Sequence, residues 1–395
     1  MNTRVYLAKL IDVLLPVLAM LVALLVGILL LLLLGSDPVK AYSALIQGAL
    51  GNVSGITQTL TKATPLLLVG LGICIAFRGG VINIGGEGQI VVGALAATAF
   101  AVSFSKLPGL ILLPLTLLSA AAAGLVWGGI PGLLKARLGV NEILTTVMMN
   151  QIALRLMNFL LRGPLLDPEH VAAGTSIPQS AALPESIWLP RLVPRTLFHS
   201  GAILAVLLAL AVYFLLWRTT IGYRIRAVGL NPHASRYAGI PVPKYVTLSL
   251  ALSGMLCGLA GAVEVLGVHH RMLEGLSGGY GFSGIVAALF GKLHPLGAIP
   301  ASALFGALLV GADKMQRAVQ VPSALAIALQ GLVVLFVVSS DLYVRRRTRR
   351  RVGEDGPEEA VEGAQFEEPP AGTGEGANVA SADVASEGAG REEDK

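Results

Sequence analysis

The sequence predicts an all-α membrane protein, a polytopic bundle of about ten membrane-spanning helices. Of its 395 residues, 54% are hydrophobic and 13% are charged, whereas soluble domains carry about 25% charged residues. The mean hydropathy is +0.73. Residues 13–34 form an uncharged run of 22 residues, long enough to cross a hydrocarbon core of roughly 30 Å. Together, these features predict a transmembrane bundle.

The first predicted span is the run at 13–34. The apolar core of a secretory signal has about 7–15 residues and is followed by a small-residue cleavage site. This run is longer and ends in Leu-Leu-Leu-Leu-Gly-Ser-Asp-Pro, which is a poor cleavage site. We therefore expect it to be retained as a membrane helix.

Further apolar segments follow along the chain. They predict spans at residues 61–77, 90–105, 109–134, 143–161, 201–217, 245–266, 296–312 and 322–340. The stretch at 282–291 is too short for an ordinary crossing. It is either a tenth crossing or a re-entrant segment covered by protein, so the count ranges from nine to eleven.

Basic residues predict the orientation. Arg4 and Lys9 precede the first span, Lys135 and Arg137 mark an inside turn, and residues 345–351 read RRRTRRR. Cytoplasmic flanks of membrane helices are rich in Lys and Arg, so we expect both termini in the cytoplasm. We expect the protein itself in the cytoplasmic (inner) membrane. The polar residues 35–60 and the Pro-rich residues 162–199 are then expected to be outside loops.

Two parts are predicted. Residues 1–344 form a transmembrane domain, and residues 345–395 form a basic stop followed by an acidic tail. Residues 353–395 hold 13 of the 24 acidic residues and are rich in Gly, Ala and Glu. Such a segment cannot bury a core, so we expect a disordered cytoplasmic tail with no assigned role.

A basic segment at 218–244 separates two apolar spans and contains no acid. Within it, Asn231 can cap a helix, Pro232 suits the first helical position and Gly239 suits the stop. The predicted two-turn helix places Ala234, Tyr237 and Ala238 on one face. Either a partner docks on this short helix, or the segment binds anionic lipid headgroups.

Two glycine-rich patches occupy corresponding places in the two halves of the chain. Residues 79–93 and 275–291 each hold six glycines and precede an apolar segment. Interrupted spans in matching halves favour an internal repeat, here two five-span halves, around a central pathway. The alternative is that these glycines only allow close helix packing.

Polar residues near these patches are candidates for the pathway. Glu87 lies among glycines, where it can accept backbone N–H bonds or contact a polar substrate. Two adjacent amides lie mid-span and need partners, either another helix or a ligand. The candidate residues are Asn83, Glu87, Gln89, Asn150, Gln151 and Phe282.

Several kinds of chemistry find no support in the sequence. It contains no G-x-x-x-x-G-K-[ST] phosphate loop and no H-E-x-x-H. Cys74 and Cys257 lie in apolar runs typical of packing residues. His269 and His270 are expected at an outside surface, and Glu264 near an outside end in reach of water. We expect no enzyme activity, no metal, no cofactor in this chain and no nucleic-acid partner.

Four segments carry a family likeness. They are FRGGVINIGGEGQIVVGAL (77–95), NEILTTVMMNQIA (141–153), TTIGYRIRAVGLNPHASRYAGI (219–240) and GYGFSGIVAALFGKLHPLGAIPASALFGALLVG (279–311). Because these segments occur in this order, the chain resembles the permease subunits of binding-protein-dependent ABC importers of the ribose/nucleoside type. The Glu in N-I-G-G-E-G-Q, the G-K-L-H-P-L-G run and the long loop 162–199 are more similar to the nucleoside branch.

The resemblance implies a partner set. A second permease, the same or related, would complete the pore, two cytoplasmic ATPases would bind ATP and magnesium, and an extracytoplasmic lipoprotein would deliver substrate. The segment 218–244 would then couple to the ATPase. The residues implied in coupling are Gly222, Arg224, Arg226, Gly229, Asn231, Pro232, Ala234, Tyr237, Ala238 and Gly239.

Two other classes compete with an ABC permease for nucleosides or related pentose sugars. A self-sufficient secondary carrier of a small polar solute would work without an ATPase, and the sparse intramembrane acids disfavour it. A membrane scaffold would use the basic segment and tail only to recruit partners.

Overall fold

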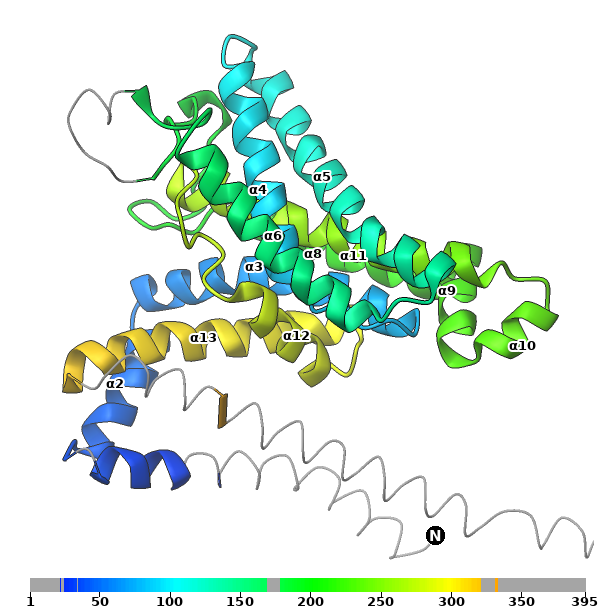
Figure 1. Ribbon diagram of the computed structural model, residues 1–395. Coiled ribbons are helices and arrows are strands. Elements are labelled where there is room, and N and C mark those ends of the chain that lie inside the picture. The colour runs from blue at the N-terminus through cyan, green and yellow to red at the C-terminus, as the bar shows by residue number, and fades with distance from the viewer. Residues whose placement is uncertain (1–21, 23–24, 34, 169–177, 321–330, 333–395) are drawn as a thin grey trace, which may run out of the picture. The chain divides into compact units, whose positions relative to one another are not determined.

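The structure, a computed structural model, describes residues 22, 25–33, 35–168, 178–320 and 331–332. Within these ranges the chain is built from helices, and the only strand pairing consists of isolated bridges (Figure 1). The helices before the middle of the chain are α2 (Pro38–Leu50), α3 (Val53–Arg78), α4 (Gly86–Ser103), α5 (Gly109–Leu138) and α6 (Glu142–Leu161). Those after it are η1 (Glu185–Ile187), α8 (Gly201–Arg218), α9 (Thr220–Leu230), α10 (Pro232–Tyr237), α11 (Val242–Glu264), η2 (Val265–His269), α12 (Tyr280–Phe290) and α13 (Pro295–Val319).

Residues 35–60 do not form the predicted loop. The Asp37 side chain caps α2 by accepting from the backbone N–H of Val39 at 2.9 Å. The Asn52 side chain caps α3 by accepting from Gly55 N–H at 2.7 Å. Because these short polar side chains satisfy the free N–H groups of a first turn, two helices begin here.

Seven helices of the described part are long and apolar enough to cross a membrane. They are α3, α4, α5, α6, α8, α11 continued by η2, and α13, and they include seven of the predicted spans. The predicted stretch 282–291 falls on the shorter α12. The predicted spans at 13–34 and 322–340 lie largely outside the described residues, as does the predicted tail.

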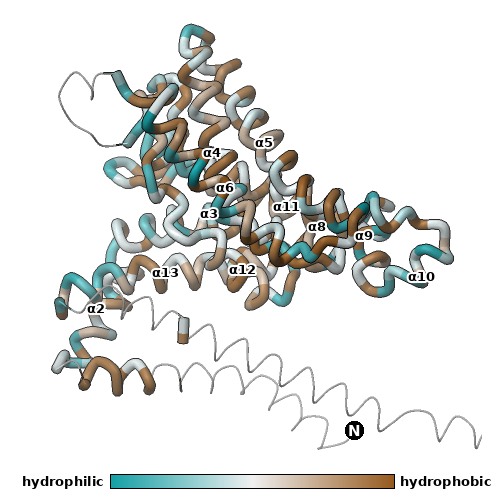
Figure 2. The backbone as a smooth tube through the Cα atoms, viewed as in Figure 1, coloured by the Kyte–Doolittle hydropathy of each residue, from teal (hydrophilic) through white to brown (hydrophobic). Residues whose placement is uncertain are grey.

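The interior is formed by α3 and α11. In the most apolar stretch of each helix, the buried share is 83% in α3 and 72% in α11 with η2. It is 28% or less in α5, α6 and α8. Figure 2 colours much of α5 as hydrophobic, and Leu118 of α5 and Leu207 of α8 are more than half exposed. Exposed apolar surface of this kind fits contact with lipid or with another membrane subunit.

Small residues hold α11 close to its neighbours. Gly254 lies against Gly124 and Gly128 of α5, and Gly258 lies against Gly93 of α4. A side chain at any of these contacts would meet backbone atoms at less than 3.0 Å. Close backbone approach through glycine is how membrane helices gain packing energy, so the glycines here serve packing.

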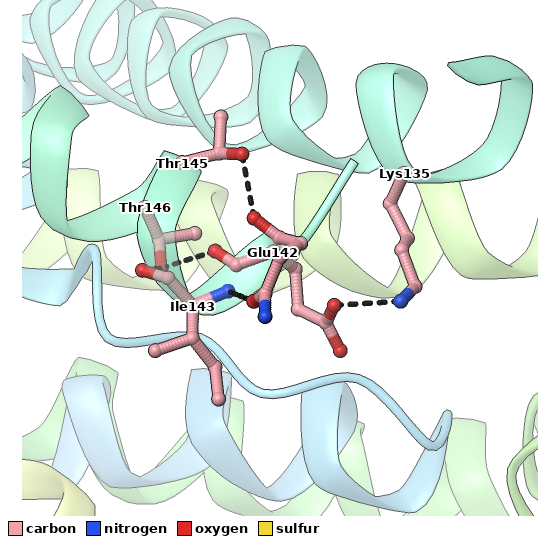
Figure 3. Close-up of polar contacts among 6 residues, drawn as sticks. Lys135, Glu142, Ile143, Thr145 and Thr146 are labelled. Carbon is pink, nitrogen blue, oxygen red and sulfur yellow. Dashed lines mark hydrogen bonds and ion pairs between the residues drawn. The ribbon is translucent and has the colours of Figure 1, made fainter. Parts of the chain in front are cut away.

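The predicted inside turn joins α5 to α6. Lys135 Nζ lies 2.8 Å from Glu142 Oε2 (Figure 3). Asn141 caps α6 by accepting from Ile143 N–H at 2.9 Å, and Thr145 donates its hydroxyl to the Asn141 carbonyl at 2.7 Å. Glu142 thus serves as a local ion-pair partner of Lys135 at this turn.

Candidate functional site

The basic segment 218–244 contains more helix than predicted. Residues 220–230 form α9, capped by the Thr219 hydroxyl, which accepts from Gly222 N–H at 3.1 Å. The short helix α10 follows as predicted: Asn231 Oδ1 accepts from Ala234 N–H at 3.0 Å and Pro232 takes the first helical position. Gly239 ends the turn with φ of +74°, a conformation that glycine adopts without steric cost.

The predicted contact face of α10 is open. Tyr237 is 94% exposed, and Ala234 and Ala238 are exposed beside it, while Ser235 faces inward. α10 is also predominantly hydrophilic in Figure 2. An exposed aromatic side chain on a short capped helix is available to a partner, because a folded chain gains nothing by holding it in water.

The first half of the segment packs on the transmembrane helices. A side chain on Gly222 would collide with Leu216 of α8, and one on Gly229 would collide with the Arg78 carbonyl at the end of α3. Arg224 donates to the Tyr245 hydroxyl of α11 at 3.0 Å. α9 is therefore clamped to three spans, and α10 is presented at its end.

Aromatic and basic side chains join α9 to both glycine patches. The guanidinium groups of Arg226 and Arg78 lie 5.6 Å and 5.5 Å from the centre of the Trp217 ring. Arg78 Nε donates to the Leu293 carbonyl at 3.1 Å. Both guanidinium distances are within cation–π range, so Trp217 and Arg78 connect Arg226 of α9 to Leu293, just beyond the second glycine patch.

The two glycine patches meet at Glu87. Its carboxylate accepts from Gly279 N–H at 3.1 Å and from Gly281 N–H at 2.8 Å. Glu87 is 9% exposed and stands at the first turn of α4, and these glycines lead into α12. Through these two charge-assisted hydrogen bonds, the Glu87 carboxylate links the start of α4 to the start of α12. We call this link the pin between the two broken helices, since both helices begin in a glycine-rich patch.

The neighbouring amides form a buried network around the start of α4. Asn83 donates to Gln89 Oε1 at 2.9 Å and to Ser253 Oγ at 2.8 Å. Asn150 accepts from Gly88 N–H at 2.8 Å and donates to the Ile84 carbonyl at 2.9 Å. These contacts support the interpretation of Asn150 as a helix–helix link.

Gln151 and Phe282 do not join this network. Gln151 is exposed on α6, and Phe282 is 52% exposed on α12. Gln151 follows Asn150 by one residue, so it points to another side of the helix. The partner expected for Gln151, either another helix or a polar ligand, stays a prediction.

A second polar cluster was missed in the sequence. Glu264 was expected to reach water, but it is only 3% exposed. His269 Nε2 lies 3.7 Å from Glu264 Oε2, and the Tyr280 hydroxyl donates toward the same carboxylate. Lys62 of α3 lies over the Tyr280 ring, 5.3 Å from its centre. The available signal was Lys62 itself, because a charged residue inside a membrane helix marks a functional candidate.

The C-terminal end of α11 and η2 pack against the described residues that precede α8. His199 Nδ1 accepts from Gly201 N–H at 3.1 Å, and Gly267 of η2 lies against its ring. Burial, reinforced by the nearby His270, lowers the pKa of His199 to about 4. His270 stacks on Trp188 with ring centres 3.9 Å apart. In the described residues, no group of three potential metal ligands occurs.

Together, the long apolar helices, the contact of Glu87 with the second glycine patch and the exposed helix α10 describe a multi-pass membrane protein. The family described as "Branched-chain amino acid transport system / permease component" matches residues 55–338. The chain belongs to this permease family.

Three relatives illustrate the likeness. The chain is 40% identical over 333 residues to the guanosine ABC transporter permease protein NupP of Bacillus subtilis, which covers 84% of this chain and 94% of that protein. It is 37% identical to the glucose ABC transporter permease protein TsgB13 of Haloferax volcanii, over 88% and 93% of the two chains. It is 33% identical to the nucleoside ABC transporter permease protein NupB of Lactococcus lactis, over 77% and 84%.

Proposed function

We propose that this chain is a membrane-spanning permease subunit of an ABC importer for nucleosides, driven by ATP hydrolysis in separate ATPase subunits. The observation that carries this proposal is the 40% identity to a guanosine permease across 94% of that protein's length. The match to a nucleoside permease of a second organism supports the same class. ATP and magnesium would be bound by the ATPase partners.

The substrate class includes sugars as a second candidate. A permease named for glucose is 37% identical to this chain, only slightly less similar than the guanosine permease. A nucleoside and a hexose share one chemical feature, which is a sugar ring bearing several hydroxyl groups. The transmembrane path of this chain is therefore expected to accept such a ring.

The second permease of the pore is proposed to be a different, related chain. Bacillus subtilis has two guanosine permease proteins, to which this chain is 40% and 31% identical. The two nucleoside permeases of Lactococcus lactis are 33% and 27% identical to it. The stronger likeness to one member of each set supports a role as one half of an unequal pair.

The proposed orientation follows from the basic residues. With the segment 218–244 and the turn at 135–142 in the cytoplasm of the cell, both termini lie there too. The segment then meets the ATPase, and Tyr237 with its two alanines forms the contact. An extracytoplasmic binding lipoprotein delivers substrate on the opposite side.

A secondary carrier has one observation in its favour. The buried cluster around Glu264 and Lys62 supplies the kind of intramembrane charged groups that carriers use to couple ions. The coupling segment favours the importer, because its exposed helix α10 has no use in a self-sufficient carrier. A carrier would need no ATPase, and that difference separates the two functions experimentally.

The test of substrate class is uptake by cells. The chain is expressed with its partner permease, ATPase and binding protein in a host that lacks nucleoside uptake, and entry of labelled guanosine is measured against labelled glucose. Guanosine uptake that unlabelled nucleosides suppress supports the proposal. Glucose uptake that nucleosides leave unaffected would assign the chain to sugars.

A further inference from the structure

Four elements place polar side chains around one buried carboxylate. Glu264 is at the end of α11, His269 in η2, Tyr280 at the start of α12 and Lys62 in α3. His269 Nε2 is 3.7 Å from the carboxylate, and the Tyr280 hydroxyl donates toward it. The Lys62 ammonium lies over the Tyr280 ring, 5.3 Å from its centre. We refer to these four residues as the outer cluster.

Burying the ionisable groups of the outer cluster costs free energy, which indicates that the cluster has a function. Ionisable groups at membrane depth are disfavoured by several kcal/mol and are usually part of a substrate or ion path. Lys62 makes no hydrogen bond or ion pair with any side chain in the described part of the chain beyond its contact with the Tyr280 ring. Its ammonium therefore keeps donors for a ligand.

The outer cluster is continuous with the junction of the broken helices. Tyr280 stands between Gly279 and Gly281, whose N–H groups are held by Glu87. Irregular backbone at membrane depth is tolerated only where protein covers it or where it lines a cavity. Substrate sites of membrane transporters characteristically lie at such broken helices, and Tyr280 belongs to both the junction and the cluster.

The backbone on the outer side is irregular as well. The chain turns from α11 into the π-helix η2, which ends at His270 in the left-handed region with φ of +56°. π-Helical turns occur frequently at functional sites. The outer loop covers this turn, because Leu189 N–H donates to the Leu266 carbonyl and Leu183 N–H donates to the His270 carbonyl.

From this arrangement we infer that the outer cluster is the permease's own binding site for the hydroxyl groups of a sugar ring. The inference rests on the proposed function and names which part of the substrate the membrane domain recognises. The Glu264 carboxylate accepts hydrogen bonds from neighbouring ring hydroxyls, and Lys62 donates to hydroxyl or ring oxygens. A free nucleobase has no vicinal hydroxyls to occupy this site.

The test uses the complete transporter and a pair of matched substrates. Uptake of a labelled ribonucleoside and of its 2′,3′-dideoxy analogue is measured for the wild type and for Glu264→Gln and Lys62→Met. The exposed residues Glu185 and Lys106 supply matched controls, Glu185→Gln and Lys106→Met. Because the same binding protein delivers both compounds to every variant, a change in preference belongs to the permease.

For Glu264→Gln we expect ribonucleoside uptake to fall at least about tenfold and dideoxynucleoside uptake to fall much less. Sites built to bond hydroxyl groups discriminate strongly against analogues that lack them, so the preference should shrink in this variant and in Lys62→Met. Both controls keep the wild-type ratio. Protein level in the membrane and basal ATP hydrolysis by the complex check that each variant folds and assembles.

An unchanged ratio in both variants, at whatever absolute rate, would overturn the inference and leave the proposed function standing. If Glu264→Gln does not assemble, the ratio of ribonucleoside to dideoxynucleoside uptake in Lys62→Met tests the inference by itself. A wild-type complex that carries neither nucleosides nor hexoses would overturn the proposed function and the inference together.

Discussion

Gly229 of α9 lies against Gly80, with its Cα 2.8 Å from where a Cβ on Gly80 would stand. This contact joins the basic segment 218–244 to the first glycine patch. It leaves no room for a side chain on either residue. α9 therefore packs directly on the backbone at the start of the first glycine patch.

The first prediction concerns that contact. In Gly229→Ala, the new methyl group collides with the Arg78 carbonyl, which is backbone and cannot rotate away. We expect ATP-driven uptake to fall at least about tenfold, since overpacking costs roughly 1–3 kcal/mol and displaces backbone. Substrate-stimulated ATP hydrolysis should lose its dependence on the loaded binding protein.

The control for this variant is another glycine of the bundle. A Cβ on Gly129 of α5 would make only one ordinary contact, at 3.7 Å from the Ala251 side chain. Gly129→Ala should keep uptake within about twofold, because an unstrained Gly→Ala change is neutral or slightly stabilising. Equal uptake by the two variants would show that the contact at Gly229 has no role in coupling.

The second prediction concerns the exposed face of α10. Tyr237→Ala removes a ring that is 94% exposed, so the thermal stability of the permease should change by less than about 0.5 kcal/mol. Binding of the ATPase should weaken about tenfold or more, as expected for an aromatic anchor at an interface. The amount of ATPase that co-purifies with the permease measures this binding.

Phe159→Ala is the matched control, because Phe159 is also largely exposed, at 69%, but lies on α6 outside the basic segment. It should leave the ATPase bound. Loss of ATPase from Phe159→Ala to the same degree as from Tyr237→Ala would contradict the assignment of α10.

The third prediction concerns the pin between the broken helices. Glu87→Ala leaves the N–H groups of Gly279 and Gly281 without their acceptor. Hydrogen bonds to a charged group contribute about 1.5–3 kcal/mol each, so losing both should destabilise the variant by about 3–6 kcal/mol. Thermal unfolding in detergent measures the loss, with the exposed Glu185→Ala as control. A melting temperature unchanged in Glu87→Ala would exclude the pinning role.

The fourth prediction concerns pH. The pKa of His199 is lowered to about 4 in the folded state, compared with about 6.5 in an unfolded chain. The folded state therefore binds fewer protons between these values, and its stability is complete above about pH 6.5 and declines as the pH falls toward 4. Between pH 7.5 and 5 we expect a loss of about 2 kcal/mol from this residue.

His199→Gln keeps an acceptor for Gly201 N–H but cannot take up a proton, so its melting temperature should fall less over the same pH range. His233 is exposed on α10, and His233→Gln should behave like the wild type. An identical pH dependence in His199→Gln and wild type would contradict the assignment.

The features that the sequence predicted correctly are those decided by local chemistry. The apolar runs predict α4, α5, α6, α8 and α11 because a membrane requires one long uncharged stretch per helix. The cap of α10 follows from Asn231, Pro232 and Gly239, which act within one turn of the backbone. α2 had the same kind of signal in Asp37 followed by Pro38, which was outweighed by the polar composition around it.

The features that were missed depend on tertiary contacts. α9 was taken as loop because its arginines look solvated, although Arg224 bonds Tyr245 and Arg226 lies at the Trp217 ring. Lys62 was placed at the start of a span, but α3 begins nine residues earlier, at Val53, and this puts Lys62 inside the helix. Its position beside Tyr280 joins residues more than two hundred apart in the chain, and no local pattern encodes that distance.

ATP dependence is the property that tests the central claim most directly. The chain is reconstituted into vesicles with its partner permease and ATPase, with loaded binding protein outside and ATP sealed inside, and labelled nucleoside uptake is followed. We predict uptake that requires hydrolysable ATP, ceases when the ATPase is omitted and falls at least about tenfold in Gly229→Ala. Nucleoside uptake by this chain alone, driven by an ion gradient without ATPase or ATP, would contradict the claim.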